Sequence, residues 1–179
     1  MERNDEKRET GETMVVRTDR PHMPAGYLPA EEKGTLLPWR HAQQRLEEAV
    51  NYWIVTVRPD GRPHVMPVWG VWLDDKLYFS SSPQTRHSRN LGQNPVVSVH
   101  LESGEDVVIV EGTAHEYASP PRAVTVRVAK AYSAKYAASG YAPEAEEWDD
   151  GGLYVVQPSL ALGWDSFPDH CTRWHFDER

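Results

Sequence analysis

The stretch from residue 52 to residue 81 constrains the fold most, because its apolar residues alternate with polar ones across two tight turns. It reads YWIVTVRPDGRPHVMPVWGVWLDDKLYFSS. The PDG segment contains Gly61, which can adopt the positive φ that a hairpin needs, and an Asp–Asp pair marks the second turn. The pattern predicts three consecutive antiparallel strands over Tyr52–Arg58, Pro63–Leu73 and Lys76–Ser81.

Further β runs follow, interrupted by short helical segments. PVVSVHLES and DVVIVEGTAHEY are rich in valine, and LYVVQPSLALGWDSF and TRWHF lie near the end of the chain. Helical patterns begin at Pro38, run over QTRHSRNL as far as Gly92, and begin again after Ser119, a candidate N-cap. Hairpins with few helices predict a mainly β fold, an antiparallel barrel with helices packed at its openings.

Chain length and net charge limit the classes of protein to which this sequence can belong. The 179 residues suit one domain, with a flexible tail and extended segment over 1–35 and the folded domain over 36–179. Asp and Glu number 27 against 19 Lys and Arg, which argues against nucleic-acid binding. We expect a cytoplasmic protein that does not cross a membrane, because the charged N-terminus resembles no secretory signal and Cys171 is the single cysteine.

The segment SSSPQTRHSRN, residues 80–90, gathers hydroxyls and cations in an acidic chain. Serines at a strand end and Arg86 and His87 at a helix start are the donors that bind a phosphate. Cations at this place oppose the helix dipole unless an anion is bound. The alternative is that Arg86 and Arg89 pair with nearby carboxylates and that the serines only form the turn.

Several motifs in this order resemble the pyridoxamine 5′-phosphate oxidase-like, FMN-binding split-barrel superfamily. They are TVRPDGRPHVMPVW, LYFSSSPQTRHSRNL, VVIVEGTAHEY, ALGW and TRW, within residues 38–176. The resemblance lies nearest the flavin- and deazaflavin-dependent oxidoreductase branch. It implies a six-stranded split β-barrel that forms a homodimer, with cofactor sites at the subunit interface.

The resemblance also implies a set of cofactor-binding residues. One strand would pass the isoalloxazine ring, a serine-rich turn and helix would hold the phosphate, and two C-terminal residues would often reach in from the other subunit. In that order these are His64, Val65, Met66, Pro67 and Val68, then Ser80, Ser81, Ser82, Thr85, Arg86, His87, Arg89 and Asn90, then Trp164 and Arg173.

Departures from the family pattern bear on the activity. HVMPVW has no strong cation where the vitamin-processing oxidases use Arg and Lys, and their Arg-Lys pair is Arg86-His87 here. Val107 stands near the place of a polar Gln, and DHCTRWHF replaces their C-terminal substrate signature. True pyridoxine-phosphate oxidase activity is therefore not expected, and the F420 or general FMN-reductase branches fit better.

Other polar residues could in principle carry chemistry. His170, Cys171 and His175 do not share one strand face, so no metal site is predicted, and Cys171 is read as an inert thiol. His64 is either a ring contact or a histidine at the barrel rim. Trp69 and Trp72 have opposite parity, which predicts that one faces the barrel interior and the other a helix or a partner.

The sequence therefore predicts an FMN-binding oxidoreductase that transfers hydride between its cofactor and a small conjugated molecule. The alternative cofactor is F420, with Arg40, Arg89 and Lys130 as possible contacts of its anionic tail. An alternative of another class is a non-catalytic flavin- or haem-binding protein. No side chain is assigned as acid or base. EAEEWDD, residues 144–150, is read as a solvated acidic loop that could disfavour anionic substrates.

Overall fold

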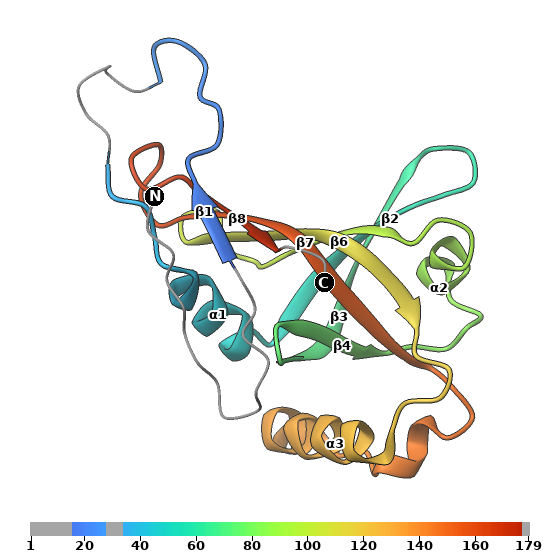
Figure 1. Cartoon of the computed structure of the whole chain (residues 1–179). Coiled ribbons are helices and arrows are strands. Elements are labelled where there is room, and N and C mark those ends of the chain that lie inside the picture. Colours follow the sequence, from blue (N-terminus) through green and yellow to red (C-terminus); the bar gives the residue numbers. More distant parts are fainter. Residues whose placement is uncertain (1–15, 28–33, 177–179) are drawn as a thin grey trace.

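The computed structural model describes residues 16–27 and 34–176, and its centre is a closed barrel of six antiparallel strands (Figure 1). The strand order is β7-β4-β3-β2-β5-β6, and β6 pairs back to β7 to close the barrel. These strands are β2 (Asn51–Val57), β3 (Pro63–Leu73), β4 (Lys76–Ser80), β5 (Val96–His100), β6 (Val107–Glu116) and β7 (Leu153–Trp164). The predicted mainly β, six-stranded antiparallel barrel is confirmed.

Two more strands extend the sheet from β7. β8 (Thr172–Phe176) pairs with β7, and β1 (Val16–Asp19) pairs with β8. The sequence did not indicate β1, because VRTD is short, polar and half exposed, and the strand forms through pairing with a distant segment. Residues 1–15 of the predicted tail lie outside the described residues.

The tight turns are formed by the predicted residues. Gly61 has a φ of 81°, and Asp74 and Asp75 have φ of 50° and 58°. Left-handed backbone is uncommon for non-glycine residues, and Asp is one of the types that tolerate it. Asp75 accepts a hydrogen bond of 2.7 Å from the amide of Gln43, and Asp74 pairs with Arg127 at 2.7 Å. The β3–β4 turn thereby connects two helices that pack on different sides of the sheet.

Those two helices cover separate apolar clusters. α1 (Trp39–Glu48) packs on the cluster inside the barrel, which contains Tyr52, Ile54 and Trp72. α3 (Arg122–Tyr136) packs Tyr132 and Tyr136 on the outer face of the sheet. Each such buried side chain contributes about 1.5–3 kcal/mol of transfer free energy. Trp72 faces the interior and Trp69 stacks on Tyr136 of α3, so the predicted opposite orientation of the two tryptophans is confirmed.

The helix starts correct one prediction. α2 (Arg86–Leu91) ends at Gly92, as expected, and its N-cap is Thr85, whose side chain accepts from the N–H of Ser88. α3 begins at Arg122 with Pro121 as its N-cap and no capping side chain, so Ser119 as N-cap was wrong, because two successive prolines move the start further along the chain. Short 3₁₀ helices follow, η1 (Ala137–Ser139) and η2 (Ala145–Trp148). Within the described ranges, no helix is long and apolar enough to span a bilayer.

Candidate functional site

The polar stretch after β4 folds into a turn and α2, and its hydroxyls meet one another. Ser81 Oγ lies 2.7 Å from Nε2 of His87, 3.1 Å from Thr85 Oγ1 and 3.2 Å from Ser88 Oγ. The backbone N–H of Ser88 donates to Thr85 Oγ1. Ser82 Oγ accepts from the N–H of Gln84 at 3.2 Å. Ser81, Thr85 and His87 are therefore brought together as the sequence predicted, with a mutual hydrogen-bond network that Ser88 extends.

Two imidazoles lie beside this network. The rings of His64, on β3, and His87, on α2, stack with centroids 6.4 Å apart. Burial lowers the pKa of His87, and the neighbouring His64 lowers it further. Burial also lowers the pKa of His64, with the charges of Arg58 and Arg86 adding to the effect. Both histidines are therefore biased toward the neutral form, first by burial and then by neighbouring basic groups.

Arg58, which the sequence reading did not single out, completes a set that we call the cation cluster: Arg58, His64, Arg86 and His87. It comes from the end of β2, from β3 and from α2. Within residues 16–27 and 34–176, neither Arg58 nor Arg86 forms an ion pair with a carboxylate. Arg89 on the same helix is exposed and equally unpaired in that part of the chain. The alternative that Arg86 and Arg89 pair with nearby carboxylates has no support in these contacts.

Orphaned polar atoms in the cation cluster indicate that it suits an anion. Nε of Arg58 and Nδ1 of His64 are buried and have no hydrogen-bond partner within the described part of the protein. A buried donor without a partner costs about 1–3 kcal/mol, which a bound acceptor group would relieve. Phosphate oxygens are such acceptors, and two guanidinium groups provide the charge. The residues present therefore fit the phosphate of a flavin-type cofactor.

Two of the predicted phosphate residues point elsewhere. Ser80 Oγ accepts a hydrogen bond of 3.2 Å from the indole of Trp148, in η2. Asn90 is buried, and its amide donates to Thr56 Oγ1 at 2.9 Å, which ties α2 to β2. These two side chains therefore lie outside the hydroxyl network. Of the three serines, Ser81 contributes its hydroxyl to that network and Ser82 its carbonyl.

The β3 residues predicted beside the ring are unusually open for a central strand. Val65 is 45% and Met66 41% exposed, Pro67 is exposed, and Val68 is half-buried against the core. This part of β3 pairs with β2 along one edge, whereas its pairing with β4 covers Gly70–Leu73, so its other edge has no strand partner among the described residues. Here the exposed apolar surface starts directly beyond His64, next to the cation cluster, and its backbone is accessible to a flat molecule.

Trp164 and Arg173 do not reach this site within one chain. Ser80 pairs with Leu153 at the start of β7, whereas Trp164 is the last residue of that strand. At about 3.3 Å per residue the two ends of β7 are roughly 35 Å apart. Arg173 instead donates to Asp19 of β1 at 2.7 and 3.0 Å.

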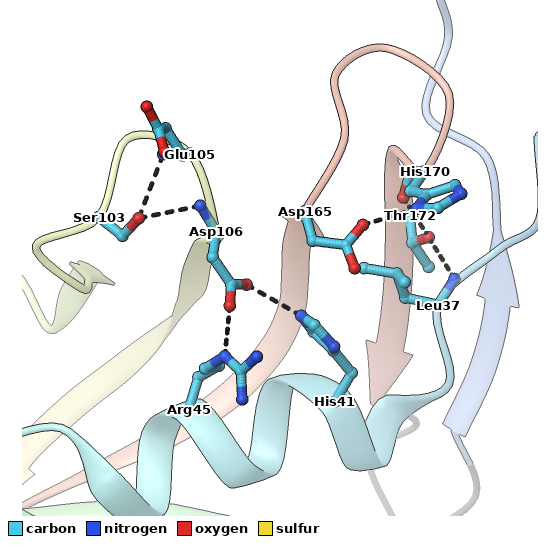
Figure 2. Close-up of polar contacts among 9 residues, drawn as sticks. All are labelled: Leu37, His41, Arg45, Ser103, Glu105, Asp106, Asp165, His170 and Thr172. Carbon is cyan, nitrogen blue, oxygen red and sulfur yellow. Dashed lines mark hydrogen bonds and ion pairs between the residues drawn. The ribbon is translucent and has the colours of Figure 1, made fainter.

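The end of the barrel near Trp164 has its own polar contacts, shown in Figure 2. His41 Nε2 lies 2.9 Å from Asp106, which also accepts from Arg45, and His170 lies 2.6 Å from Asp165. Partial burial works against ionisation of Asp106, but its bonds from Arg45 and His41 outweigh that, and its pKa is lowered. Each basic side chain drawn in Figure 2 has a carboxylate partner. Among the residues described, no group of three or more His, Cys, Asp or Glu could hold a metal ion.

Solved structures with this fold carry diverse names. A conserved hypothetical protein of Mycobacterium tuberculosis is 18% identical with a TM-score of 0.60, over 81% of this chain and 90% of that one. A haem-binding protein of Mycobacterium smegmatis is 19% identical with a TM-score of 0.57, over 75% and 57%. An F420 reductase is 23% identical with a TM-score of 0.50, over 78% and 98%. Identities this low establish the fold alone.

Curated proteins contain no match to this sequence. The family model described as pyridoxamine 5′-phosphate oxidase, in contrast, matches residues 39–162, from the start of α1 almost to the end of β7. This span includes the barrel except for the last two residues of β7, together with α2 and the cation cluster. The chain therefore belongs to the pyridoxamine 5′-phosphate oxidase family.

Proposed function

We propose that this protein binds FMN and acts as a cytoplasmic oxidoreductase, transferring hydride between the cofactor and a small conjugated molecule. The observation that carries the proposal is the cation cluster, in which two arginines and two histidines lie together without a carboxylate partner in the described part of the chain. Unpaired basic groups held close together destabilise the folded protein unless an anion binds them. Its place on a flavin-binding fold makes the cofactor phosphate the simplest anion.

Different residues would bind the phosphate and the ring of the cofactor. Arg58 and Arg86 donate charge-assisted hydrogen bonds to the phosphate, and the Ser81 and Thr85 hydroxyls complete its contacts. The open backbone of β3 lies along the ring. A bound flavin supplies the hydride chemistry, so the protein needs few catalytic side chains and acts through position, ring environment and exclusion of water.

We further propose that the protein is a homodimer whose second copy contributes Trp164 and Arg173 to each site. Two features support this proposal: the strand ends lie roughly 35 Å apart in one chain, and β3 exposes Val65 and Met66. Sedimentation should give a dimer. A monomer that still binds cofactor would contradict this part of the proposal.

The deazaflavin F420 is the second candidate cofactor. Arg58 and Arg89 are cations in addition to Arg86, and an additional anionic tail would use them. The similarity in fold to an F420 reductase agrees with this candidate without deciding it.

The experiment is a titration of the purified protein with FMN and, separately, with F420, followed by absorbance and fluorescence. Arg86→Ala should weaken binding by roughly 1.5–3 kcal/mol, or about ten- to 150-fold, because a charge-assisted phosphate contact is lost. The control is Arg62→Ala, which removes the same charge from an arginine already bonded to Asp60. Equal affinity of the wild type and Arg86→Ala would remove the phosphate assignment. If neither cofactor binds, haem is the next ligand to titrate.

A further inference from the structure

A second surface of the site, on the outer face of β3, is aromatic and lies apart from the cation cluster. The Trp69 indole stacks on Tyr136 with ring centroids 4.8 Å apart and planes at 11°, and Tyr141 lies 6.2 Å from Trp69. Tyr136 is buried, whereas Trp69 keeps 39% of its surface exposed. We call Trp69, Tyr136 and Tyr141 the aromatic platform.

Hydrogen bonds hold this platform rigidly against the sheet. The Tyr136 hydroxyl donates to the Val50 carbonyl at 2.7 Å, and the N–H of Gly70 donates back to it at 3.0 Å. The Tyr132 hydroxyl donates to the Trp69 carbonyl at 3.0 Å and accepts from the N–H of Ser80 at 3.1 Å. A large apolar ring fixed in this way and left two-fifths exposed is suited to stacking with another flat ring.

The end of β4 lies between the platform and the cation cluster. Ser80 and Ser81 are consecutive, and their side chains point to opposite sides. Ser80 Oγ bonds to Trp148 beside the platform, and Ser81 Oγ bonds to His87 in the cluster. A molecule on the platform would therefore lie next to the cofactor site without using the phosphate contacts.

The charge beside the platform is opposite to that of the cluster. η2 and its flanks carry exposed carboxylates, and the Tyr141 hydroxyl donates to one of them, Glu147, at 2.6 Å. The exposed acidic residues are Glu144, Glu146, Glu147, Asp149 and Asp150. Arg122 pairs with one of these carboxylates, Glu146, and Lys130 lines the same surface hollow. On the platform side, Lys135 lies 5.8 Å from the Tyr136 ring and is half-buried. Its ammonium donates to the Ala49 and Gly70 carbonyls and the Tyr52 hydroxyl, so its three N–H groups are all used.

We propose that the aromatic platform binds a small planar aromatic molecule that is neutral or cationic, and disfavours anionic ones. An electron-rich indole face attracts cations, and the acidic η2 region adds to this preference at low ionic strength. The proposal rests on the proposed function only in making this molecule the redox partner of the cofactor. Binding to the platform is a separate property and is testable without any flavin.

The test uses two acridines of the same ring system, the cationic 9-aminoacridine and the anionic acridine-9-carboxylate. Their fluorescence is titrated with the full-length protein, first without and then with FMN. We expect the cation to bind at least tenfold more tightly than the anion. Trp69→Ala should weaken its binding roughly tenfold, on the scale of aromatic stacking.

Matched variants separate stacking from folding and charge. Phe167→Ala removes another exposed aromatic ring, which contacts Tyr27 and Trp164 beyond the far end of β7, and should leave binding unchanged. Trp69→Leu keeps most of the apolar volume but lacks the flat ring. It replaces Trp69→Ala in the test if circular dichroism shows that Trp69→Ala is unfolded. Glu147→Gln should reduce the preference for the cation about threefold, whereas Glu105→Gln, in the β5–β6 turn, should not.

Different results would contradict the platform proposal and the flavin proposal. Equal binding of the two acridines, or equal binding by wild type and both Trp69 variants, overturns the proposal. Displacement of 9-aminoacridine by FMN would put the cofactor ring on Trp69 and overturns it as well. Failure of FMN to bind, with acridine binding that depends on Trp69, removes the flavin proposal and leaves the platform standing.

Discussion

The two ends of the barrel differ in whether their basic side chains have carboxylate partners. At the end covered by α1, His41 and Arg45 share Asp106 and His170 pairs with Asp165 (Figure 2). Arg173 and His175 share Asp19. At the end covered by α2, Arg58 and Arg86 have no carboxylate partner within the described ranges. Paired charges favour the folded chain, whereas unpaired ones favour a bound anion. The comparison therefore assigns stability to one end and ligand binding to the other.

The largest expected effect on stability is at the α1 end. Asp106→Ala removes the carboxylate that both His41 and Arg45 bond, and should lower the free energy of unfolding by about 2 kcal/mol, allowing for its partial exposure. Urea unfolding measures this at pH 7. Asp60→Ala breaks an exposed pair with Arg62 and is the control, with little change expected. Similar losses for the two variants would mean that the α1 end is not specially stabilised.

A smaller effect at the same end depends on pH. The hydrogen bond from Arg173, with a further one from His175, lowers the pKa of Asp19 to about 2, against an unfolded value of 3.8. A lowered carboxylate pKa means that the folded state favours the ionised form, so this stabilisation is complete above pH 4 and is lost as the pH falls to 2. After discounting for exposure it is on the order of 1–2 kcal/mol.

Asp19→Asn isolates this contribution. The difference in unfolding free energy between wild type and Asp19→Asn should be constant above pH 4 and should shrink toward zero near pH 2. A difference that is independent of pH across this range would show that the β1–β8 contact is not electrostatic.

The α2 end should respond to acid at a higher pH. Burial lowers the pKa of His87, and His64 adds to the shift, so the folded state favours neutral His87. This stabilisation is present above the unfolded histidine value of about 6.5 and is lost as the pH falls through the folded pKa. A bound phosphate should reverse the shift, because a nearby anion favours the imidazolium form.

Histidine NMR titrations with and without FMN measure this change. The pKa of His87 should rise on adding FMN. A pKa of His87 that FMN leaves unchanged would argue against a phosphate at Ser81 and α2. Inorganic phosphate alone, at higher concentration, should move His87 in the same direction.

The barrel strands could be predicted from the sequence more fully than the contacts at the two ends of the barrel. Period-two runs and turn residues such as Gly61 predicted all six barrel strands, because local pattern determines them. The alternation of a strand could also have separated Ser80 from Ser81, and helical spacing could have turned Asn90 inward with His87. These signals were present and were not used.

Other parts depend on distant segments. Arg58 precedes the PDG turn and resembles an ordinary hairpin residue until folding brings β3 and α2 beside it. β1 becomes a strand only through β8, and Arg173 is paired only because Asp19 lies opposite it in that register. The aromatic platform joins Trp69 to Tyr136 and Tyr141, far along the chain. No local pattern connects residues that meet only in the folded protein.

The smallest effect tests the unpaired state of the α2 end directly. Without ligand, Arg86→Ala should raise the free energy of unfolding by a few tenths of a kcal/mol, because Arg86 is the first residue of α2 and opposes its dipole. Arg89→Ala should lower it by a similar amount, since Arg89 lies in the last turn, where a cation is favourable. Saturating FMN should reverse the first sign, because the wild type then gains binding energy that Arg86→Ala lacks. Paired thermal melts with and without FMN measure this reversal. A loss of stability in ligand-free Arg86→Ala comparable to that of Asp106→Ala would mean that Arg86 has a structural partner, and the contrast between the two ends would fail.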